Sequence, residues 1–181
     1  MKGFSIIVAT DKKLGIGRDN RIPWHISADL KHFKDITTGG YVSGCKNVVI
    51  MGRKTWESLP ANARPLAGRI NAVLTANAGY SLPTGVMRFD CLHESIEYFC
   101  NTNAHNFGEV FVIGGATVYA EAIKDSRCYK IYQTKIDKEF SCDSFFPEIP
   151  DFFIESNKSP ILKEKEIEFF FIEFLLHHIV S

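Results

Sequence analysis

Residues 49–59 read VIMGRKTWESL, in which a single glycine separates an apolar run from a helix-forming segment. Residues 47–51 predict a short strand, and residues 53–59 predict a short helix. Gly52 allows another segment or a ligand to approach closely, and the start of the helix leaves backbone N–H groups free. The helix also carries two cations and a hydroxyl group, on Arg53, Lys54 and Thr55. Such a junction is typical of an anion-binding site, and it is equally typical of a surface helix with solvated cations.

A second strand–glycine–helix junction follows further along the chain. Residues 110–113 predict a strand, the pair Gly114 and Gly115 follows it, and residues 117–123 predict a helix. Paired glycines let a backbone approach a diphosphate, although for the pair alone a tight turn is the commoner explanation. Two such junctions at the carboxyl ends of strands in one parallel sheet favour a dinucleotide, which has two phosphates to bind.

The start of the chain predicts a strand followed by a loop. Residues 4–10 are a β-branched run, whereas residues 14–23 hold two glycines and a proline. Gly15 and Gly17 lack the third glycine and the immediate helix of a dinucleotide-binding fingerprint. We therefore interpret them as hinges of a mobile loop beside the first strand, which is able to act as a lid.

Asp29 is the candidate acid. Ser27 is expected to cap a helix that runs to about Ile36 and has Asp29 in its first turn. An acid in that turn ordinarily interacts with the helix dipole. Asp29 and Phe33 nevertheless share a helix face, so the carboxylate borders any pocket that Phe33 faces. A carboxylate in such a place can hold a flat, amidine-like heterocycle through two hydrogen bonds.

The remaining elements complete an α/β fold. Strands are also expected at residues 70–75 and 128–136, and a helix at residues 95–101. Residues 152–157 and 166–179 predict an antiparallel hairpin with its turn at 158–165. We expect a mainly parallel central sheet of about eight strands with helices on both faces and this hairpin at an antiparallel edge. Domains typically hold about 100–200 residues, so we expect residues 1–181 to form one domain.

Composition argues against several classes of protein. Lys plus Arg and Asp plus Glu each number 21, so the net charge of zero argues against nucleic-acid binding through bulk electrostatics. The 5 cysteines include no Cys-x-x-Cys pair, and no His/Cys cluster has the spacing of a metal site. No secretory leader or membrane-spanning run is recognisable. We therefore expect a cytoplasmic protein without a metal, a membrane or a nucleic-acid partner.

Several segments resemble the dihydrofolate reductase family. They are residues 14–17 (LGIG), 22–24 (IPW), 28–30 (ADL) with Phe33, 49–59 (VIMGRKTWESL), 64–69 (RPLAGR), 112–119 (VIGGATVY) and 143–147 (DSFFP). The match follows the family's order from Phe4 to Pro147. Its specific part is Pro23 and Trp24 with the downstream Asp29, followed by MGRKTWESL.

The resemblance implies roles for residues around the substrate. Asp29 would bind N3 and the 2-amino group of the pterin and raise the basicity of N5. Thr134 would support Asp29, and Trp24 would hold a water between Asp29 and the substrate. Arg69 would pair with the α-carboxylate of the glutamate tail, for which a bidentate guanidinium is suited. The walls of the substrate pocket would be Ile7, Val8, Leu30, Phe33, Leu59, Leu66, Ile113 and Tyr119.

The resemblance also implies NADPH as the cofactor. The nicotinamide would lie among Ala9, Ile16 and Tyr119. The diphosphate and its surroundings would involve Gly52, Thr55, Leu74, Gly114, Gly115, Ala116, Thr117 and Val118. The 2′-phosphate would meet Arg53, Lys54 and Thr75, and the Gly114–Gly115 peptide would be cis. Many relatives place an arginine where this chain has Ala76 or Thr117, so the 2′-phosphate would depend mainly on Arg53 and Lys54.

The implied activity is hydride transfer from C4 of NADPH to C6 of 7,8-dihydrofolate, with protonation at N5, to give tetrahydrofolate. Antifolate inhibitors would then bind as well, and a native fusion to thymidylate synthase is possible. One alternative is a reductase of the same fold that acts on a pyrimidine intermediate of flavin synthesis, which would not need Trp24, Asp29 and Arg69 together. Another is a silent nucleotide-binding module, against which Asp29 and the intact loop argue.

Overall fold

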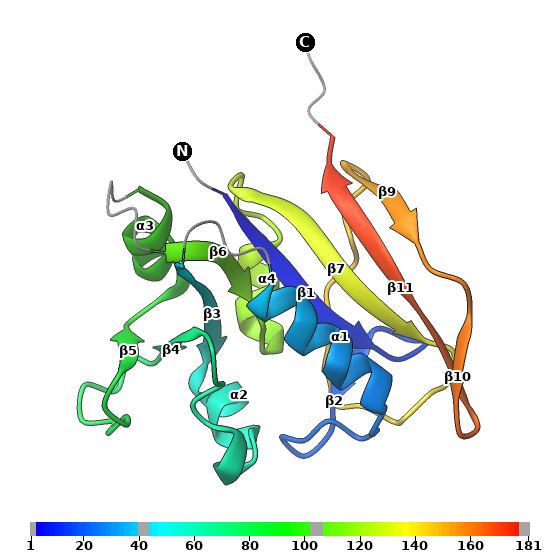
Figure 1. Ribbon diagram of the computed structural model, residues 1–181, viewed down its shortest axis with the longest axis horizontal. Coiled ribbons are helices and arrows are strands. Elements are labelled where there is room, and N and C mark those ends of the chain that lie inside the picture. Colours follow the sequence, from blue (N-terminus) through cyan, green and yellow to red (C-terminus); the bar gives the residue numbers. More distant parts are fainter. Residues whose placement is uncertain (1–2, 40–43, 102–106, 178–181) are drawn as a thin grey trace.

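The computed structural model describes residues 3–39, 44–101 and 107–177. Their main feature is a nine-stranded sheet with the order β10–β11–β7–β1–β6–β3–β4–β5, while β9 pairs with another part of β11. Figure 1 shows this twisted sheet running from β5 on the left to β9–β11 on the right. A separate two-stranded sheet joins β2 (Gly15–Gly17) to β8 (Ser144–Phe145).

The central strands are parallel and the edge strands are antiparallel. The parallel strands are β7 (Cys128–Ile136), β1 (Phe4–Thr10), β6 (Phe107–Val112), β3 (Lys46–Gly52), β4 (Ile70–Leu74) and β5 (Val86–Phe89). The antiparallel strands are β9 (Phe153–Lys158), β10 (Leu162–Glu164) and β11 (Ile167–Leu176), the last of which pairs with β7. The predicted mainly parallel sheet with an antiparallel C-terminal edge is therefore confirmed.

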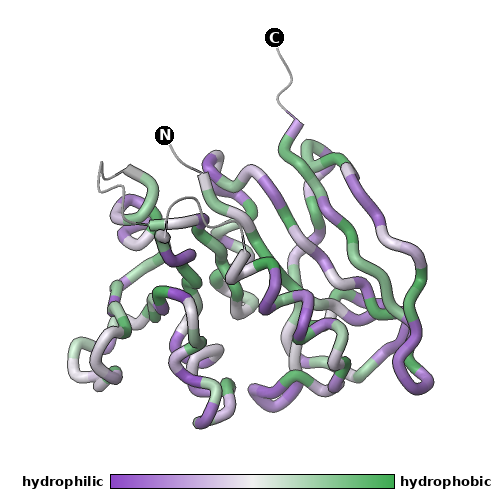
Figure 2. The backbone as a smooth tube through the Cα atoms, viewed as in Figure 1, coloured by the Kyte–Doolittle hydropathy of each residue, from purple (hydrophilic) through white to green (hydrophobic). Residues whose placement is uncertain are grey.

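Helices cover both faces of the sheet because its strands are apolar on both faces. Side chains alternate along a strand, so Ile7, Val49 and Phe111 face one way and pack with Trp56 and residues of α1. That face carries α1 (Ser27–Thr38), α2 (Arg53–Ser58) and the 3-10 turn η1 (Ala61–Ala63). The other face carries α3 (Leu92–Asn101) and α4 (Ala116–Ala122). Figure 2 shows hydrophobic colours along the central strands and a hydrophilic tip between β10 and β11.

The predicted bounds of the central elements lie close to the observed bounds. The strands predicted at 4–10 and 128–136 have those bounds. The strand predicted at 47–51 is one residue longer at each end, and the strand predicted at 70–75 is one residue shorter at its end. The other predicted helices and strands are present, with ends shifted by as much as three residues. Apolar periodicity was therefore sufficient wherever a segment crosses the middle of the sheet.

The edge strands were predicted less well. The expected turn at 158–165 contains β10, the expected loop at 14–23 contains β2, and neither β5 nor β8 was foreseen. These strands are short and pair only with distant segments, so they carry no alternation of their own. Positions 178 and 179 of the expected last strand lie outside the described residues.

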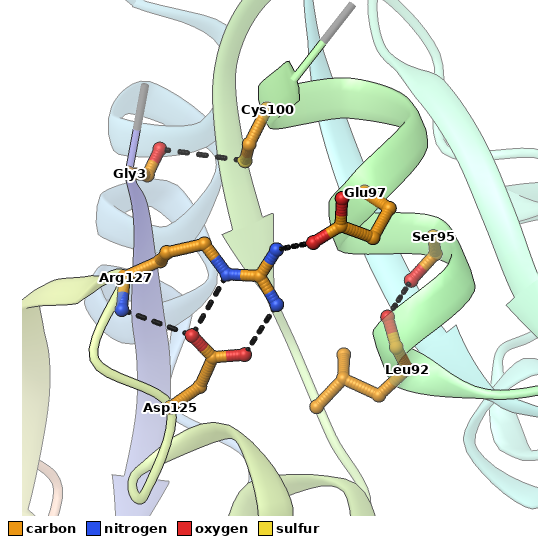
Figure 3. A network of polar contacts seen from close by, with 7 residues as sticks. All are labelled: Gly3, Leu92, Ser95, Glu97, Cys100, Asp125 and Arg127. Carbon is orange, nitrogen blue, oxygen red and sulfur yellow. Dashed lines mark hydrogen bonds and ion pairs between the residues drawn. The ribbon is translucent and has the colours of Figure 1, made fainter. Parts of the chain in front are cut away.

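Arg127 ties α3 to the turn between α4 and β7 (Figure 3). Its Nε and Nη2 donate to the two carboxylate oxygens of Asp125 at 2.9 and 2.7 Å, and its Nη1 forms an ion pair with Glu97. The Arg127 hydrogen bond is the main reason that the pKa of Asp125 lies below its ordinary value. The Arg127 carbonyl accepts the N–H of Phe4. This network therefore fixes the amino-terminal end of β1.

Asn47, near the amino-terminal end of β3, joins three elements. Its side-chain amide donates to the carbonyls of Thr37 and Gly39 at 3.2 and 2.8 Å, and its Oδ1 accepts the N–H of Glu109 at 2.8 Å. A Cβ on Gly108 would lie 2.1 Å from the same oxygen, so only glycine fits beside it. One fully buried side chain thus connects the end of α1 to β3 and β6.

Replacing Asn47 by alanine should lower the free energy of unfolding by about 2–4 kcal/mol, because buried backbone groups lose their partners. Chemical denaturation measures this loss. The matched control is Asn157→Ala on the exposed strand β9, which should change stability by no more than about 0.5 kcal/mol. Equal effects of the two substitutions would contradict a bridging role for Asn47.

Candidate active site

Asp29 lies in the first turn of α1 and is half-buried. Burial raises the pKa of Asp29, and a hydrogen bond from the hydroxyl group of Thr134 on β7 partly opposes that effect. The net pKa therefore lies above its ordinary value. Thr134 is the residue that the resemblance placed behind Asp29, and the structure brings the two side chains into contact.

The start of α1 differs from the prediction. Ser27 is the first residue of the helix rather than its cap, and the N-cap residue, Ile26, makes no side-chain capping bond. The carboxylate of Glu164 on β10 accepts the N–H groups of Ser27 and Ala28 instead, at 2.9 and 3.0 Å. The sequence analysis missed Glu164 because its partners lie 137 and 136 positions away, where no local pattern points to them.

Trp24 offers a buried donor beside these elements. The residue is 8% exposed and packs in one cluster with Ile26, Ile136 and Phe169. Within the described part of the chain, its indole N–H is buried and has no hydrogen-bond partner. Buried donors are almost always bonded to protein, water or ligand, so this N–H suits the water-binding role that the resemblance implies.

Apolar side chains gather on the face of the sheet that carries α1 and α2. Most of the predicted pocket residues belong to this cluster, namely Ile7, Phe33, Leu59, Leu66 and Ile113. Leu30 on α1 is 49% exposed. The side chains of Val8 and Tyr119 pack in the cluster on the opposite face. The structure thus brings most of the predicted wall together and leaves two members behind the sheet.

Tyr119 reaches the first strand from that opposite face. Its hydroxyl donates to the Ile7 carbonyl at 2.8 Å, and its ring would lie 3.2 Å from a Cβ on Gly114. Burial and the nearby Asp29 carboxylate raise the pKa of Tyr119, which keeps the hydroxyl protonated. The Asp29 carboxylate therefore affects the ionisation of Tyr119, the residue whose ring lies against Gly114.

Arg69 is held above the ring of Phe33. Its guanidinium carbon lies 5.6 Å from the ring centroid, and its Nη1 donates to the Thr37 hydroxyl at 2.8 Å. Its Nε donates to the carbonyl of Ala67 at 3.1 Å. These contacts fix the Arg69 cation beside the apolar cluster, next to the face of α1 that carries Asp29 and Phe33.

The two glycine junctions lie side by side. The N–H of Gly52 donates to the Gly114 carbonyl at 2.8 Å, and a Cβ on Gly115 would lie 3.2 Å from Thr55 Oγ1. A Cβ on Gly52 would meet Val118 at 3.3 Å. The Gly114–Gly115 peptide is cis, as predicted. Residues of the two predicted anion sites therefore form one continuous surface at the carboxyl ends of β3 and β6.

Residues predicted for the adenosine 2′-phosphate lie around this surface. Arg53 is exposed, forms an ion pair with Glu57 at 3.5 Å and stands over the Tyr80 ring at 5.7 Å. Lys54 is also exposed, and Thr75 is buried at the end of β4. Of the other predicted cofactor residues, Leu74 is buried, Ala116 is half-buried and Thr117 is exposed.

Arg88 is a cation that the sequence analysis missed. It lies on β5, donates to the Thr75 carbonyl at 3.4 Å and pairs with Asp90 at 2.9 Å. Residues 86–89 show no clear alternation, so the strand that presents Arg88 beside Thr75 was not recognised.

The predicted lid loop is anchored at its start by a buried carboxylate. Asp11 accepts the N–H groups of Lys13, Gly15 and Phe140 at 2.8, 2.7 and 3.1 Å. Burial raises the pKa of Asp11, but these donors outweigh it, so the pKa lies below its ordinary value. The predicted nicotinamide neighbours Ile16 and Ala9 are both half-buried, and they pack against different apolar clusters.

No helix among the described residues combines the length and apolarity needed to cross a bilayer.

A parallel sheet with two glycine junctions at its carboxyl edge is the architecture of α/β enzymes that bind dinucleotides there. A sequence profile of the family described as "Dihydrofolate reductase" matches residues 3–175. The dihydrofolate reductase of Aedes albopictus is 37% identical over 171 residues, which cover 93% of this chain and 92% of that protein. The chain belongs to the dihydrofolate reductase family.

Two further comparisons agree with this assignment. The solved structure "Schistosoma mansoni Dihydrofolate reductase" has a TM-score of 0.83 at 33% identity and covers 97% of this chain and 98% of that chain. The "Bifunctional dihydrofolate reductase-thymidylate synthase 1" of Arabidopsis thaliana is 40% identical over 151 residues, which cover 81% of this chain. The chain spans only 29% of the length of that relative.

Replacing Thr134 by valine should raise the pKa of Asp29 further, because burial remains while the stabilising hydroxyl donor is lost. The ¹³C shift of the Asp29 carboxyl carbon, followed against pH, measures this change. The matched control is Thr134→Ser, which retains the hydroxyl and should leave the pKa near its original value. An unchanged pKa in the valine variant would show that Thr134 does not stabilise the carboxylate.

Proposed function

We propose that this chain reduces 7,8-dihydrofolate to tetrahydrofolate, with the hydride going from C4 of NADPH to C6 of the substrate and a proton to N5. The observation that carries the proposal is the half-buried carboxylate of Asp29. Thr134 donates a hydrogen bond to it, and its charge raises the pKa of Tyr119, which lies beside the glycine junctions. NADPH supplies the hydride when it is bound. The chain's own residues supply alignment, a dry surface and one acidic group.

Asp29 would bind the pterin through two parallel hydrogen bonds, from N3 and from the 2-amino group. A neutral imine is a poor hydride acceptor, so N5 must gain a proton as the hydride arrives. The negative charge of Asp29 favours the protonated pterin, and a water on the indole N–H of Trp24 would carry the proton. Closure of the loop at 14–24 over the nicotinamide would exclude other water.

The other site residues would bind the two ligands. The apolar cluster around Ile7, Phe33 and Ile113 would hold the pterin and benzoyl rings, and Arg69 would pair with the tail carboxylate. The paired junctions at Gly52 and Gly114 would receive the diphosphate. The remaining predicted residues stay assigned as the resemblance implies, with Arg53 and Lys54 at the 2′-phosphate. Antifolate inhibitors would compete for Asp29.

Replacing Asp29 by asparagine should reduce turnover at neutral pH by about a hundredfold or more, because the charge that favours protonated pterin is lost. NADPH affinity should stay near normal. Activity should partly recover in acid, where solvent protonates the substrate without help. Measuring kcat/KM with dihydrofolate from acid to neutral pH provides the test. Normal turnover, or a loss that does not shrink as pH falls, would remove Asp29 from the mechanism.

Replacing Arg69 by leucine should raise KM for dihydrofolate by about tenfold or more, because the tail carboxylate loses its charged partner. A pteridine without the glutamate tail is the internal control, and its KM should hardly change. Steady-state kinetics with both substrates measure the difference. An equal loss for the tailless compound would mean that Arg69 has a structural role and does not bind the tail carboxylate.

We also infer that residues 1–181 form one domain that works in the cytoplasm. The unbroken central sheet, which joins strands from β1 to β11, supports the single domain. A fusion to thymidylate synthase, as named for the Arabidopsis relatives, stays a prediction for this chain. The mass of the native protein in cell extracts, and synthase activity that copurifies with it, test the fusion.

A further inference from the structure

The first turn of α1 depends on a distant side chain. Helix starts leave backbone N–H groups unpaired, and a residue such as serine, threonine, aspartate or asparagine usually binds one of them. Here the N-cap residue, Ile26, cannot do so. Glu164 on β10 supplies both carboxylate oxygens instead, Oε1 to the N–H of Ser27 and Oε2 to that of Ala28. The charged cap thus comes from the antiparallel edge of the sheet.

The Glu164 contact has the properties of a charge-assisted cap. The N–H groups of Ser27 and Ala28 hold the pKa of Glu164 below its ordinary value, so the carboxylate stays charged at neutral pH. A negative charge at the amino end of a helix also interacts favourably with the helix dipole. Asp29 follows directly after the two residues that Glu164 binds, so any movement of this turn moves the Asp29 carboxylate.

Other contacts join the same edge strands to the same part of α1. The ring of His32 stacks on Phe171 of β11 with centroids 3.8 Å apart and planes inclined by 20°. Phe171 is paired in register with Thr134, which hydrogen-bonds to Asp29. In the sequence, Asp29 therefore lies between two anchored sites, Ser27 and Ala28, which Glu164 binds, and His32, which stacks on Phe171.

We propose that Glu164 is a positioning residue, which fixes the first turn of α1 and thereby sets the placement of the Asp29 carboxylate against the substrate. This inference rests on the proposed function of Asp29. Glu164 need not touch either ligand, because it acts through the N–H groups of Ser27 and Ala28. Its effect on catalysis should consequently disappear when Asp29 can no longer perform its role.

A double-mutant cycle tests this dependence. Glu164→Gln keeps the length of the side chain but replaces one accepting oxygen with an NH₂ group, so one helix N–H loses its acceptor. In the unaltered chain, E164Q should lower kcat/KM for dihydrofolate by about tenfold, and in the Asp29→Asn chain by less than about twofold. NADPH affinity should be unchanged. Equal losses in the two backgrounds would overturn the proposal.

Glu166→Gln is the matched control for loss of charge. Glu166 lies in the same β10–β11 turn, is exposed and faces Lys163 at 3.6 Å. This variant should keep kcat/KM and the melting temperature of the unaltered chain. If E166Q reproduces the loss seen in E164Q, a general charge effect explains the data and the proposal fails.

Hydrogen exchange separates this inference from the proposed function. The N–H of Leu30 donates to the Ile26 carbonyl at 3.1 Å and so reports on the first turn of α1. Its protection should fall in E164Q and stay unchanged in E166Q. If the unaltered chain fails to reduce dihydrofolate, the proposed function fails, while the Leu30 exchange still decides whether Glu164 fixes this turn. Full protection of Leu30 in E164Q would overturn the positioning role.

Discussion

The partial burial of one carboxylate, that of Asp29, is the constraint on which the site depends. Removing a carboxylate from water favours its neutral form, and the Thr134 hydroxyl offsets only part of this effect. The proposed role of Asp29, pairing with a flat heterocycle, nevertheless requires that the side chain stay in place. Its helix is accordingly held from several directions, by Glu164, by the stacked His32 and Phe171, and through Asn47 at its far end.

The raised pKa of Asp29 lowers the free energy of unfolding as the pH rises. A carboxyl group whose pKa is higher in the folded chain binds its proton more tightly there than in the unfolded chain. The contribution of Asp29 to the free energy of unfolding therefore falls as the pH rises from the ordinary pKa of 3.8 to the raised folded value, and it is constant above that. Asp125 has the opposite sign, because Arg127 lowers its pKa and its contribution is lost as the pH falls through the folded value. The two groups lie in different networks: Asp29 at the site and Asp125 at the amino-terminal end of β1.

Local sequence patterns were sufficient for the parts of the fold that are determined locally. Strands β1 and β7 were predicted with their observed bounds, and the junctions at Gly52 and Gly114 were located as strand–glycine–helix units. The cap of α1 was assigned to Ser27, since a serine before an apolar helix usually has that role. Tertiary structure overrode this preference, because the Glu164 carboxylate offers a charged acceptor that no window around Ser27 contains. For the same reason, local patterns did not predict strand β10 or the position of Arg88 beside Thr75.

The contrast between the two halves of the sheet explains why the site needs both. The parallel half presents strand ends and glycine junctions at one edge, which suits the phosphates and nicotinamide of the proposed cofactor, while its buried carboxylate, Asp11, is bound to backbone N–H groups of the loop that follows β1. The acid comes from α1, whose first turn has no cap of its own and rests on the antiparallel half through Glu164 and Phe171. Strand β7 lies where the two halves meet, and its Thr134 contacts Asp29 while Ala9 of β1 is its register partner. Among the described residues, β11 pairs with β7 and carries Phe171, so a late strand supports the helix that presents the proposed acid, a residue from the first third of the chain.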